Sequence, residues 1–492
     1  LEDTGAEAEL AQEPTQAPDL TVTQEAFCPP TAAATQRVKT ILPPSELGIP
    51  RFAASPTNFV DFQGALHFAV NYEDGRSALW KSTGTDAGTA AVKDFPVGPA
   101  FSPRVLQLTP TPTRLFFMAP DATRGQELWV SDGTGAGTRF VKDLTPGQEG
   151  SYLSHLTAVG NDVVFFREVY DAATSTTRNE LWRSDATDTG TVRLRDFGAG
   201  VEVSYLDAKP GNALLFFVSE PSGAISLWRT DGSASGTVAL KRLDAGPGTY
   251  VYDVRTQGTL TLFALKESTG LTELWKSDGT AGGTLRLASF GASRAVALLG
   301  TLGTNAYVTT TSLSTQYMVI YRVPLAGGNP TSVVTLPNNH ASQGEAFPYI
   351  SEVSAVPGGT KLFFSVTIGS NGPAPRDTQL WVTNGTAGGT ALLRRPLSLS
   401  DEYGSPVYAV ADNLVYFSAP DANGANIEPW VSNGTASGTR RLKDIGVDGS
   451  SYPREFFRMG SRVYFSAYDE TLAGQLWSSA LTNTCAAPEV GQ

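Results

Sequence analysis

Short apolar runs alternate with polar turns along almost the whole chain. In one representative stretch the runs lie at residues 105–108, 115–119, 127–131 and 139–144. Runs of this length, bounded by Gly, Pro, Asn, Asp and Ser, predict β-strands. No long segment has the 3.6-residue periodicity of an amphipathic helix. The pattern therefore predicts an all-β protein.

One phrase recurs along the chain, in which Leu (Pro in one copy) precedes Trp and Ser or Thr follows two residues later. Its tryptophans, all eight in the chain, are Trp80, Trp129, Trp182, Trp228, Trp275, Trp381, Trp430 and Trp477. They are 46 to 53 residues apart, except for one gap of 106 in which Tyr321 takes the missing place. The chain thus contains nine units of about 48 residues.

Each unit has the strand pattern of a propeller blade. Four strands in 40–50 residues are typical of such a blade. Strands such as 115–117 and 214–217 are apolar on both faces, as expected for sheets packed between two neighbours. We expect a single closed β-propeller, all-β with nine four-stranded blades, over residues 31–482.

The two ends of the chain are predicted to meet in one blade. The last unit has only three strands, and residues 36–42 resemble residues 138–144, the fourth strand of another unit. The N-terminal strand should therefore complete the last blade and leave no open edge. Cys28 precedes that strand, and Cys485, in the tail 483–492, follows Trp477 by eight residues. A disulfide between them would close the ring and imply an oxidising compartment; two unpaired thiols are the alternative.

The charge is concentrated at the start of the chain. The net charge is −12, and residues 1–27 hold seven acids and no Lys or Arg, so the rest carries −5. Residues 1–30 are predicted to form a disordered acidic tether, suited either to a lipoprotein anchored upstream of Leu1 or to a secreted protein. The remaining balance does not favour nucleic acid. The sequence contains no run of 18 apolar residues, so it predicts no membrane span.

The repeated phrase resembles a known family. The segment Glu127 to Thr134 reads Glu-Leu-Trp-Val-Ser-Asp-Gly-Thr, and Glu273 to Thr280 reads Glu-Leu-Trp-Lys-Ser-Asp-Gly-Thr. Both are similar to the ELWxxDGT repeats of bacterial, notably myxobacterial, surface and secreted proteins, over residues 37–480. The resemblance implies export, to the cell surface, the periplasm or the medium, and a repeat fold. It implies little about activity.

The Asp-Gly-Thr part of the phrase has a structural explanation. Asp at a hairpin corner accepts a hydrogen bond from a backbone N–H two residues on, and Gly supplies a positive φ. A calcium loop is the alternative, but each copy has one carboxylate where calcium takes six to eight oxygens. Asn384 and Asn433 replace Asp in two copies and Thr83 in another, which favours a turn. The tryptophans are expected to pack between blades, with sugar stacking as the alternative.

One set of acids is a candidate ligand site. An acid follows the second strand of most units, and these acids are Asp74, Asp121, Asp171, Glu220, Glu267, Asp421 and Asp469. A broken ring of carboxylates there could attract a cation or a basic partner; the alternative is a set of turn-forming acids. Units six and seven, which lack this acid, depart from the repeat at residues 322–328 and 367–376, and form a second candidate surface.

No catalytic constellation stands out. His67, His155 and His340 are far apart in the sequence, and neither a nucleophile elbow nor a zinc or phosphate motif occurs. We therefore expect an exported binding or scaffold protein that holds a protein or polysaccharide on its faces, without catalysis, cofactor or metal. Two alternatives stay open: a carbohydrate-active lyase or hydrolase with acids at the propeller centre, and a structural component of the envelope or matrix.

Overall fold

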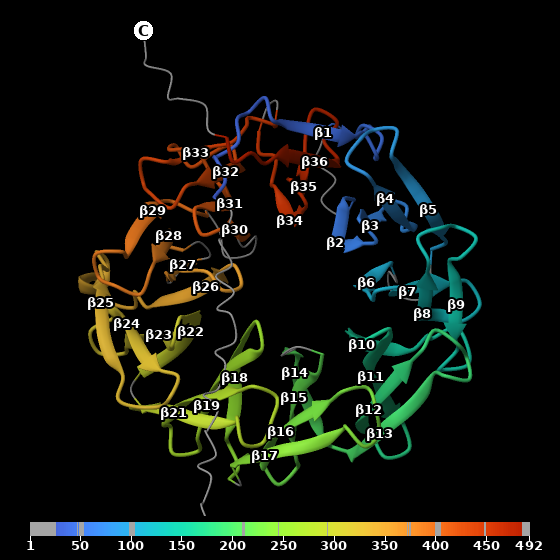
Figure 1. Ribbon diagram of the computed structural model, residues 1–492, viewed down its shortest axis with the longest axis horizontal. Coiled ribbons are helices and arrows are strands. Elements are labelled where there is room, and N and C mark those ends of the chain that lie inside the picture. The colour runs from blue at the N-terminus through green and yellow to red at the C-terminus, as the bar shows by residue number, and fades with distance from the viewer. Residues whose placement is uncertain are drawn as a thin grey trace, which may run out of the picture.

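The structure is a computed structural model that describes residues 26–484, apart from 47, 49–53, 98–103, 209–211, 245, 293, 371, 373–374, 399–404 and 447–448. Its strands form nine four-stranded antiparallel sheets, arranged as blades around one axis (Figure 1). The nine-bladed all-β propeller predicted from the repeat is confirmed. The first strand of each blade lies nearest the axis and the fourth lies at the rim.

The first four blades follow one another in chain order. Blade 1 is β2 (Pro56–Phe62), β3 (Ala65–Asn71), β4 (Ser77–Ser82) and β5 (Thr89–Phe95). Blade 2 is β6 (Leu106–Pro110), β7 (Leu115–Asp121), β8 (Gly125–Ser131) and β9 (Arg139–Lys142). Blade 3 is β10 (Tyr152–Val159), β11 (Asp162–Asp171), β12 (Thr176–Ser184) and β13 (Val192–Ala199). Blade 4 is β14 (Glu202–Ala208), β15 (Leu214–Ser219), β16 (Ile225–Thr230) and β17 (Val238–Asp244).

The next four blades repeat this order. Blade 5 is β18 (Tyr250–Gln257), β19 (Leu260–Lys266), β20 (Thr272–Ser277) and β21 (Leu285–Phe290). Blade 6 is β22 (Arg294–Leu302), β23 (Asn305–Ser312), β24 (Met318–Pro324) and β25 (Thr331–Leu336). Blade 7 is β26 (Pro348–Ser354), β27 (Leu362–Ile368), β28 (Asp377–Thr383) and β29 (Ala391–Arg394). Blade 8 is β30 (Val407–Ala411), β31 (Leu414–Ala419), β32 (Glu428–Ser432) and β33 (Thr439–Arg441).

Blade 9 takes strands from both ends of the described chain. It contains β34 (Arg454–Met459), β35 (Arg462–Tyr468), β36 (Gly474–Ala480) and β1 (Thr35–Lys39). β1 pairs antiparallel with β36, with Thr35 opposite Ser479 and Arg37 opposite Trp477. The Thr35 hydroxyl donates a hydrogen bond to Ser479 Oγ at 3.1 Å. A register shift lies between Arg37 and Lys39, and the pairing of the third and fourth strands has one in several other blades.

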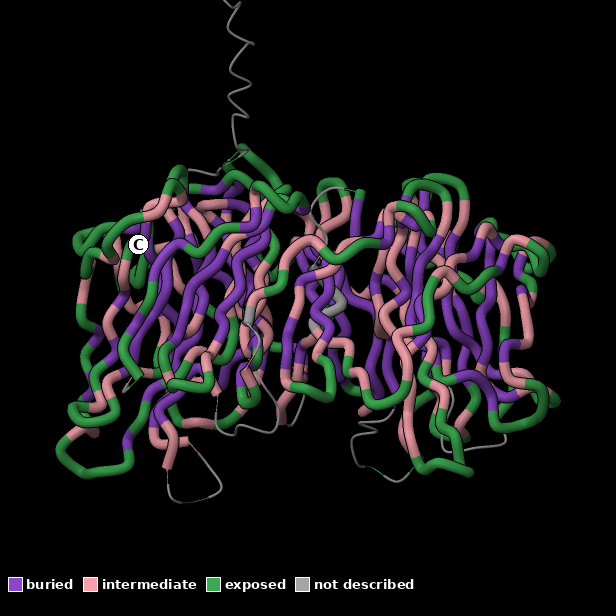
Figure 2. Tube along the Cα trace, turned by 90° about the horizontal axis from the view of Figure 1, so that it is seen from below, coloured by how far each residue is buried: buried purple, intermediate pink, exposed green. Residues whose placement is uncertain are grey.

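The core consists of nine apolar clusters among the described residues, one for each interface between neighbouring blades. Between blades 1 and 2, Phe95 packs against Phe117 and against Trp129, with ring centroids 5.8 and 5.1 Å apart. Figure 2 shows the buried segments in the strands and the exposed ones at the two ends of the ring. Each fully buried aromatic side chain contributes about 2–3 kcal/mol of burial free energy. A blade shelters its apolar faces only with neighbours on both sides.

Helix is almost absent from the described residues. A single 3-10 turn, η1 (Ala341–Gln343), precedes blade 7. Among the residues that the structure describes, no helix is long and apolar enough to cross a membrane. Residues 1–25 of the expected tether, and Cys485 in the tail, lie outside the described residues.

Candidate functional site

The Asp-Gly-Thr segments form tight turns between the third and fourth strands. In blade 2, Asp132 Oδ1 accepts hydrogen bonds from Thr134 N at 2.9 Å and Thr134 Oγ1 at 2.7 Å. Gly133 has φ +88°, and a Cβ on Gly137 would come within 2.1 Å of Asp132 Cγ. The two glycines therefore serve the turn geometry. The carboxylate is used within its own turn.

The same turn forms where Asn replaces Asp. Asn384 Oδ1 accepts bonds from Thr386 N at 3.1 Å and Thr386 Oγ1 at 2.7 Å. Asn433 makes the same pair of contacts with Thr435. The acceptor oxygen is thus the feature that all these turns share, since an amide supplies it as well as a carboxylate does.

In six of the nine blades the residue two positions before the repeat Trp is a buried acid or amide, and these side chains have two different uses. In blades 2, 8 and 9 it binds the connection that leads to the next blade or comes from the chain start. Glu428 accepts from Ile445 N and Gly446 N, both at 3.0 Å, and Glu127 accepts from Leu144 N at 3.4 Å. Gln475 accepts from Ile41 N at 2.7 Å in the same way.

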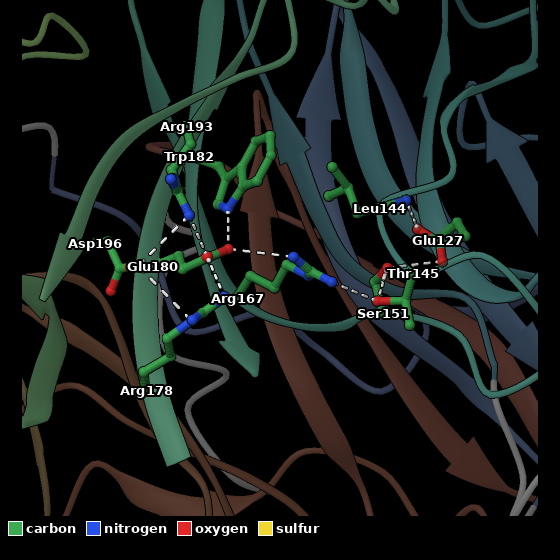
Figure 3. A network of polar contacts seen from close by, with 10 residues as sticks. All are labelled: Glu127, Leu144, Thr145, Ser151, Arg167, Arg178, Glu180, Trp182, Arg193 and Asp196. Atoms are coloured by element: carbon green, nitrogen blue, oxygen red, sulfur yellow. Dashed lines mark hydrogen bonds and ion pairs between the residues drawn. The ribbon is translucent and has the colours of Figure 1, made fainter. Parts of the chain in front are cut away.

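In blades 3 and 5 the equivalent Glu turns toward its own Trp instead. Glu180 accepts bonds from Trp182 Nε1 at 2.9 Å and Arg193 Nη1 at 2.7 Å, and pairs with Arg167 at 3.2 Å (Figure 3). Glu273 accepts from Trp275 Nε1 at 2.9 Å and from Arg286. Where this side chain binds the connection instead, as Glu127 does in blade 2 and Gln475 in blade 9, the Trp129 and Trp477 Nε1 atoms are buried without a hydrogen-bond partner among the described atoms.

The seven acids predicted as a ring lie at one end of the propeller, in the connections between second and third strands. We call this the acidic end, defined by Asp74, Asp121, Asp171, Glu220, Glu267, Asp421 and Asp469. In all five aspartates the carboxylate accepts the backbone N–H two residues on, at 2.8–3.0 Å. Asp469 is also 2 % exposed and pairs with Arg37. These aspartates form their own turns.

The two glutamates of the acidic end differ from the aspartates. Their turns close through the backbone, because Gly223 N donates to Glu220 O and Gly270 N to Glu267 O, both at 2.8 Å. Each side chain is one methylene longer and accepts only a hydroxyl bond among the described residues, from Ser222 at 3.3 Å or Thr269 at 3.0 Å. Glu220 and Glu267 are therefore the members of the predicted ring whose carboxylates remain available to a ligand.

Both glutamates line pockets at equivalent interfaces between blades. The pocket beside Glu267, between blades 4 and 5, has a volume of about 490 Å³. Its lining residues are Lys241, Leu243, Glu267, Ser268, Thr269, Glu273, Trp275 and Arg286. The pocket beside Glu220, between blades 3 and 4, has a volume of about 370 Å³. Its lining residues are Arg195, Asp196, Phe197, Val201, Val218, Glu220, Pro221, Ser222 and Trp228.

The cations in these pockets are engaged within the protein. Lys241 Nζ donates to Thr284 O at 2.9 Å and lies 5.5 Å from the Trp275 ring centroid. Arg195 covers the Trp228 ring at 4.4 Å. Each cation stands thirteen residues after the Trp of its own blade and reaches the Trp of the next. This spacing also places Lys93 over Trp129 and Arg394 over Trp430, and it is the signal that sequence reasoning missed.

The histidines lie apart from one another. His67, in β3, packs edge-on against Phe62, and burial lowers the pKa of its imidazole. His155 is in the first strand of blade 3 with φ +56°. His340 precedes blade 7 and lies 3.7 Å from the buried carboxylate of Asp377. The structure brings no two of the three together, and among the described residues no group of His, Cys, Asp and Glu has the arrangement of a metal site.

Acids on the strands nearest the axis serve the joints between blades. Asp253 accepts from Leu298 N in the next blade at 2.7 Å, and Glu455 accepts from Asn58 N in the next blade at 3.0 Å. Burial raises the pKa of both carboxyls. The second candidate surface lies in blades 6 and 7, and residues 371, 373 and 374 of it are outside the described residues.

Comparisons with known proteins assign the chain to no family. No protein-family model and no curated protein matches the chain. The solved structures that align with the chain include one from an analysis of two prolyl endopeptidases. It has 11 % identity and a TM-score of 0.42, covering 76 % of this chain and 55 % of that one. A puromycin hydrolase mutant has 13 % identity and a TM-score of 0.44, covering 84 % and 58 %. Oligopeptidase B from Leishmania major has 10 % identity and a TM-score of 0.43, covering 77 % and 53 %. The chain spans little more than half the length of each.

These comparisons correct the functional expectation. The expectation of a binding or scaffold protein without catalysis was wrong: the solved structures named above are of peptidases and a hydrolase. The physical reason is that the propeller architecture serves enzymes and binding proteins alike, so a repeat without a catalytic motif does not define a scaffold. At these identities and TM-scores the likeness assigns no activity to this chain.

Proposed function

We propose that the protein binds small cationic ligands, with an ammonium or guanidinium group, in the pockets beside Glu267 and Glu220. The observation that supports this most is the contrast within the acidic end. The five aspartate carboxylates accept backbone N–H bonds, while the two glutamate carboxylates, which line pockets, accept only a hydroxyl bond from the residues that the structure describes.

The charge of each pocket supports a cationic ligand. Beside Glu267, the carboxylate of Glu273 is taken by Trp275 and Arg286, and Lys241 is held by Thr284 O and the Trp275 ring. Beside Glu220, the guanidinium of Arg195 lies on Trp228. A carboxylate with a neighbouring hydroxyl at the edge of a pocket can pair with a cation and accept its remaining hydrogen bonds.

Export is part of the same proposal. The resemblance of the repeats to ELWxxDGT proteins and the acidic opening segment support a protein that is secreted, periplasmic or on the outer surface, with a lipid anchor or without one. A disulfide between Cys28 and Cys485 fits that compartment. Cys28 is buried, and its N–H donates to Thr482 O at 2.7 Å, three residues before Cys485.

Isothermal titration with agmatine, which carries an ammonium and a guanidinium group, tests the proposal. We expect saturable binding to the full chain, and no binding of glutarate or glucose. Glu267→Gln and Glu220→Gln should each lose a set of sites or weaken it at least tenfold, because the ion pair is removed. Glu149→Gln is the matched control, since Glu149 is exposed and lines neither pocket. Agmatine heats that stay at the buffer level, or that both pocket variants leave unchanged, contradict the proposal.

A further inference from the structure

Exposed aromatic side chains gather at the acidic end of one arc of the ring. Those among the large exposed apolar residues are Tyr152, Tyr170, Tyr250, Tyr317, Phe347 and Tyr349. All belong to blades 3, 5, 6 and 7 or to the connection that enters blade 7. The strand register places these residues at the acidic end. Tyr152, for example, pairs with Glu168, close to the connection that contains Asp171.

Three of these tyrosines begin the strands nearest the axis in alternate blades. Tyr152 opens β10, Tyr250 opens β18 and Tyr349 is the second residue of β26. Their exposed fractions are 69 %, 51 % and 44 %. Figure 1 places β10, β18 and β26 innermost in their blades. We call these three residues the tyrosine arc.

The same position of the repeat in blade 9 holds Tyr452, which is half-buried and contacts Tyr468, with ring centroids 6.4 Å apart. The corresponding strands of blades 1 and 8 begin with Pro56 and Val407, both buried. A single exposed Tyr on a protein surface needs no explanation. The exposed tyrosines at this position are confined to blades 3, 5 and 7, and in blade 5 Tyr250 also contacts Tyr252, with ring centroids 6.1 Å apart.

Carboxylates accompany the tyrosine arc. Glu168 is exposed opposite Tyr152, Glu202 is exposed at the start of β14 between the first two tyrosines, and Glu352 is exposed in β26. Lys266 stands opposite Tyr250. The neighbouring Arg294 is engaged with Thr310 Oγ1 and Tyr321 OH. The surface therefore offers aromatic faces with an excess of negative charge.

We propose that the tyrosine arc binds an extended polypeptide segment in which Lys or Arg alternates with apolar residues. A tyrosine ring accepts a guanidinium or ammonium group on its face and an apolar side chain by contact. The carboxylates pair with the same cations and set the sign of the charge that is accepted. Because the three rings are spread over five blades, a ligand that contacts all of them must be long and carry several contact groups.

This inference uses residues outside both pockets, so it stands or falls separately from the proposed function. Fluorescence anisotropy with a labelled 15-residue peptide of alternating Arg, Leu and Gly measures it on the full chain. We expect saturable binding that weakens as salt is raised, and at least tenfold weaker binding of the same peptide with Glu in place of Arg.

The decisive variant is the triple change Tyr152→Ala, Tyr250→Ala and Tyr349→Ala. Its control is Val192→Ala, Val238→Ala and Leu285→Ala, because these three residues are exposed in the same way but begin fourth strands at the opposite end of the ring. The first triple should weaken peptide binding at least tenfold and the control less than twofold.

Equal binding by the two triples overturns the inference, as does equal binding of the Arg and Glu peptides. Loss of agmatine binding in Glu267→Gln with peptide binding intact separates the two proposals. If the tyrosine triple lowers the thermal midpoint, Tyr152→Ala alone, at the most exposed position, keeps the test open and should weaken binding at least threefold.

Discussion

Glu127 and Glu180 occupy the same position in consecutive blades, two residues before the repeat Trp, yet the pKa values of their carboxyls move in opposite directions. Burial raises the pKa of Glu127 to about 7, against the hydrogen bonds from Ser151 and Leu144 N. Burial also acts on Glu180, but the bonds from Trp182 and Arg193 and the charge of Arg167 outweigh it and lower the pKa. Arg167 joins the two sites, because its Nη2 donates to Thr145 Oγ1, which lies 3.1 Å from Ser151 Oγ (Figure 3).

Glu127→Gln should stabilise the protein at alkaline pH. The folded-state pKa of about 7 lies above the ordinary value of 4.5. The folded state therefore binds the proton more tightly, and its stability falls as pH rises from 4.5 through about 7. The loss is on the order of 3 kcal/mol. We expect the thermal midpoint to fall less between pH 5 and pH 8 in the variant than in the parent.

Gln475 shows why this substitution is tolerated, because an amide already does the equivalent task in blade 9. Glu428, whose pKa burial also raises to about 7, should respond in the same way to Glu428→Gln. A thermal midpoint of Glu127→Gln that drops between pH 5 and pH 8 as far as that of the parent would exclude this account.

Glu180→Gln should destabilise the protein at neutral pH, in contrast to Glu127→Gln. Glu180 is ionised there, 1 % exposed, and accepts bonds from two arginines. The substitution replaces the carboxylate, whose charge offsets that of Arg167, with a neutral amide. The Arg167 side chain is itself largely buried. We expect a cost of about 2 kcal/mol, seen as a lower urea midpoint. The cost should shrink toward acid pH, because the parent's stability from this group is lost as pH falls through its depressed pKa.

The Asp-Gly-Thr turns allow a test of geometry against metal binding. Asp132→Asn keeps the acceptor oxygen, as Asn384 does in blade 7, and should cost less than about 0.5 kcal/mol. Asp132→Ala removes the acceptor from Thr134 N and should cost about 1–2 kcal/mol. Thermal melts with and without a chelator complete the test. A chelator-induced drop of many degrees would require a bound cation that neither the geometry nor the substitutions explain.

Repeat number, strand count and blade class were predictable because they depend on local patterns. A Trp every 48 residues and runs apolar on both faces leave few other architectures. The use of each side chain was not predictable. The phrase Glu-Leu-Trp reads the same at Glu127 and Glu273, yet one Glu binds a backbone N–H and the other its own Trp. The difference depends on an Arg eleven residues after Trp275, where Phe140 stands in blade 2.

The predicted acids show the same limit. Asp and Glu in the acidic end were indistinguishable as charges, but one methylene decides whether the carboxylate reaches its own turn. The cations over the Trp228 and Trp275 rings were missed because each acts on the Trp of the next blade, 33 or 34 residues further along the sequence. Contacts of that kind appear only once the blades are placed side by side.

The pairing of Cys28 with Cys485 remains a prediction, and peptide mapping without reductant tests it. We expect one cross-linked peptide that joins the two ends of the chain. Cys28→Ser with Cys485→Ser should lower the thermal midpoint, with a cost of roughly 2–5 kcal/mol in the chain-entropy account. Addition of reductant to the parent should reproduce that loss. Two alkylated thiols in the folded protein would refute the pairing.

Gln475→Glu is expected to introduce at blade 9 the pH dependence that Glu127 and Glu428 have in their own blades. Gln475 Nε2 donates to Leu42 O at 2.8 Å and to Thr471 Oγ1 at 2.9 Å, while its oxygen accepts from Ile41 N. A protonated carboxyl can keep one donor and one acceptor there. An ionised carboxylate has no donor and faces the Leu42 carbonyl oxygen in a fully buried site.

The pKa of the new carboxyl should therefore be raised, as it is at Glu127, and its stability contribution lost as pH rises through that pKa. The variant should resemble the parent at pH 5 and lose about 2–3 kcal/mol by pH 8. Hydrogen exchange of the Ile41 and Leu42 amides should report the loss first, since those N–H groups lose their acceptor geometry. Gln475→Ala should be destabilised equally at both pH values, because it removes the hydrogen bonds of the amide and adds no titratable group. Identical pH dependence in the Glu and Ala variants would contradict a raised pKa for a carboxyl at this position.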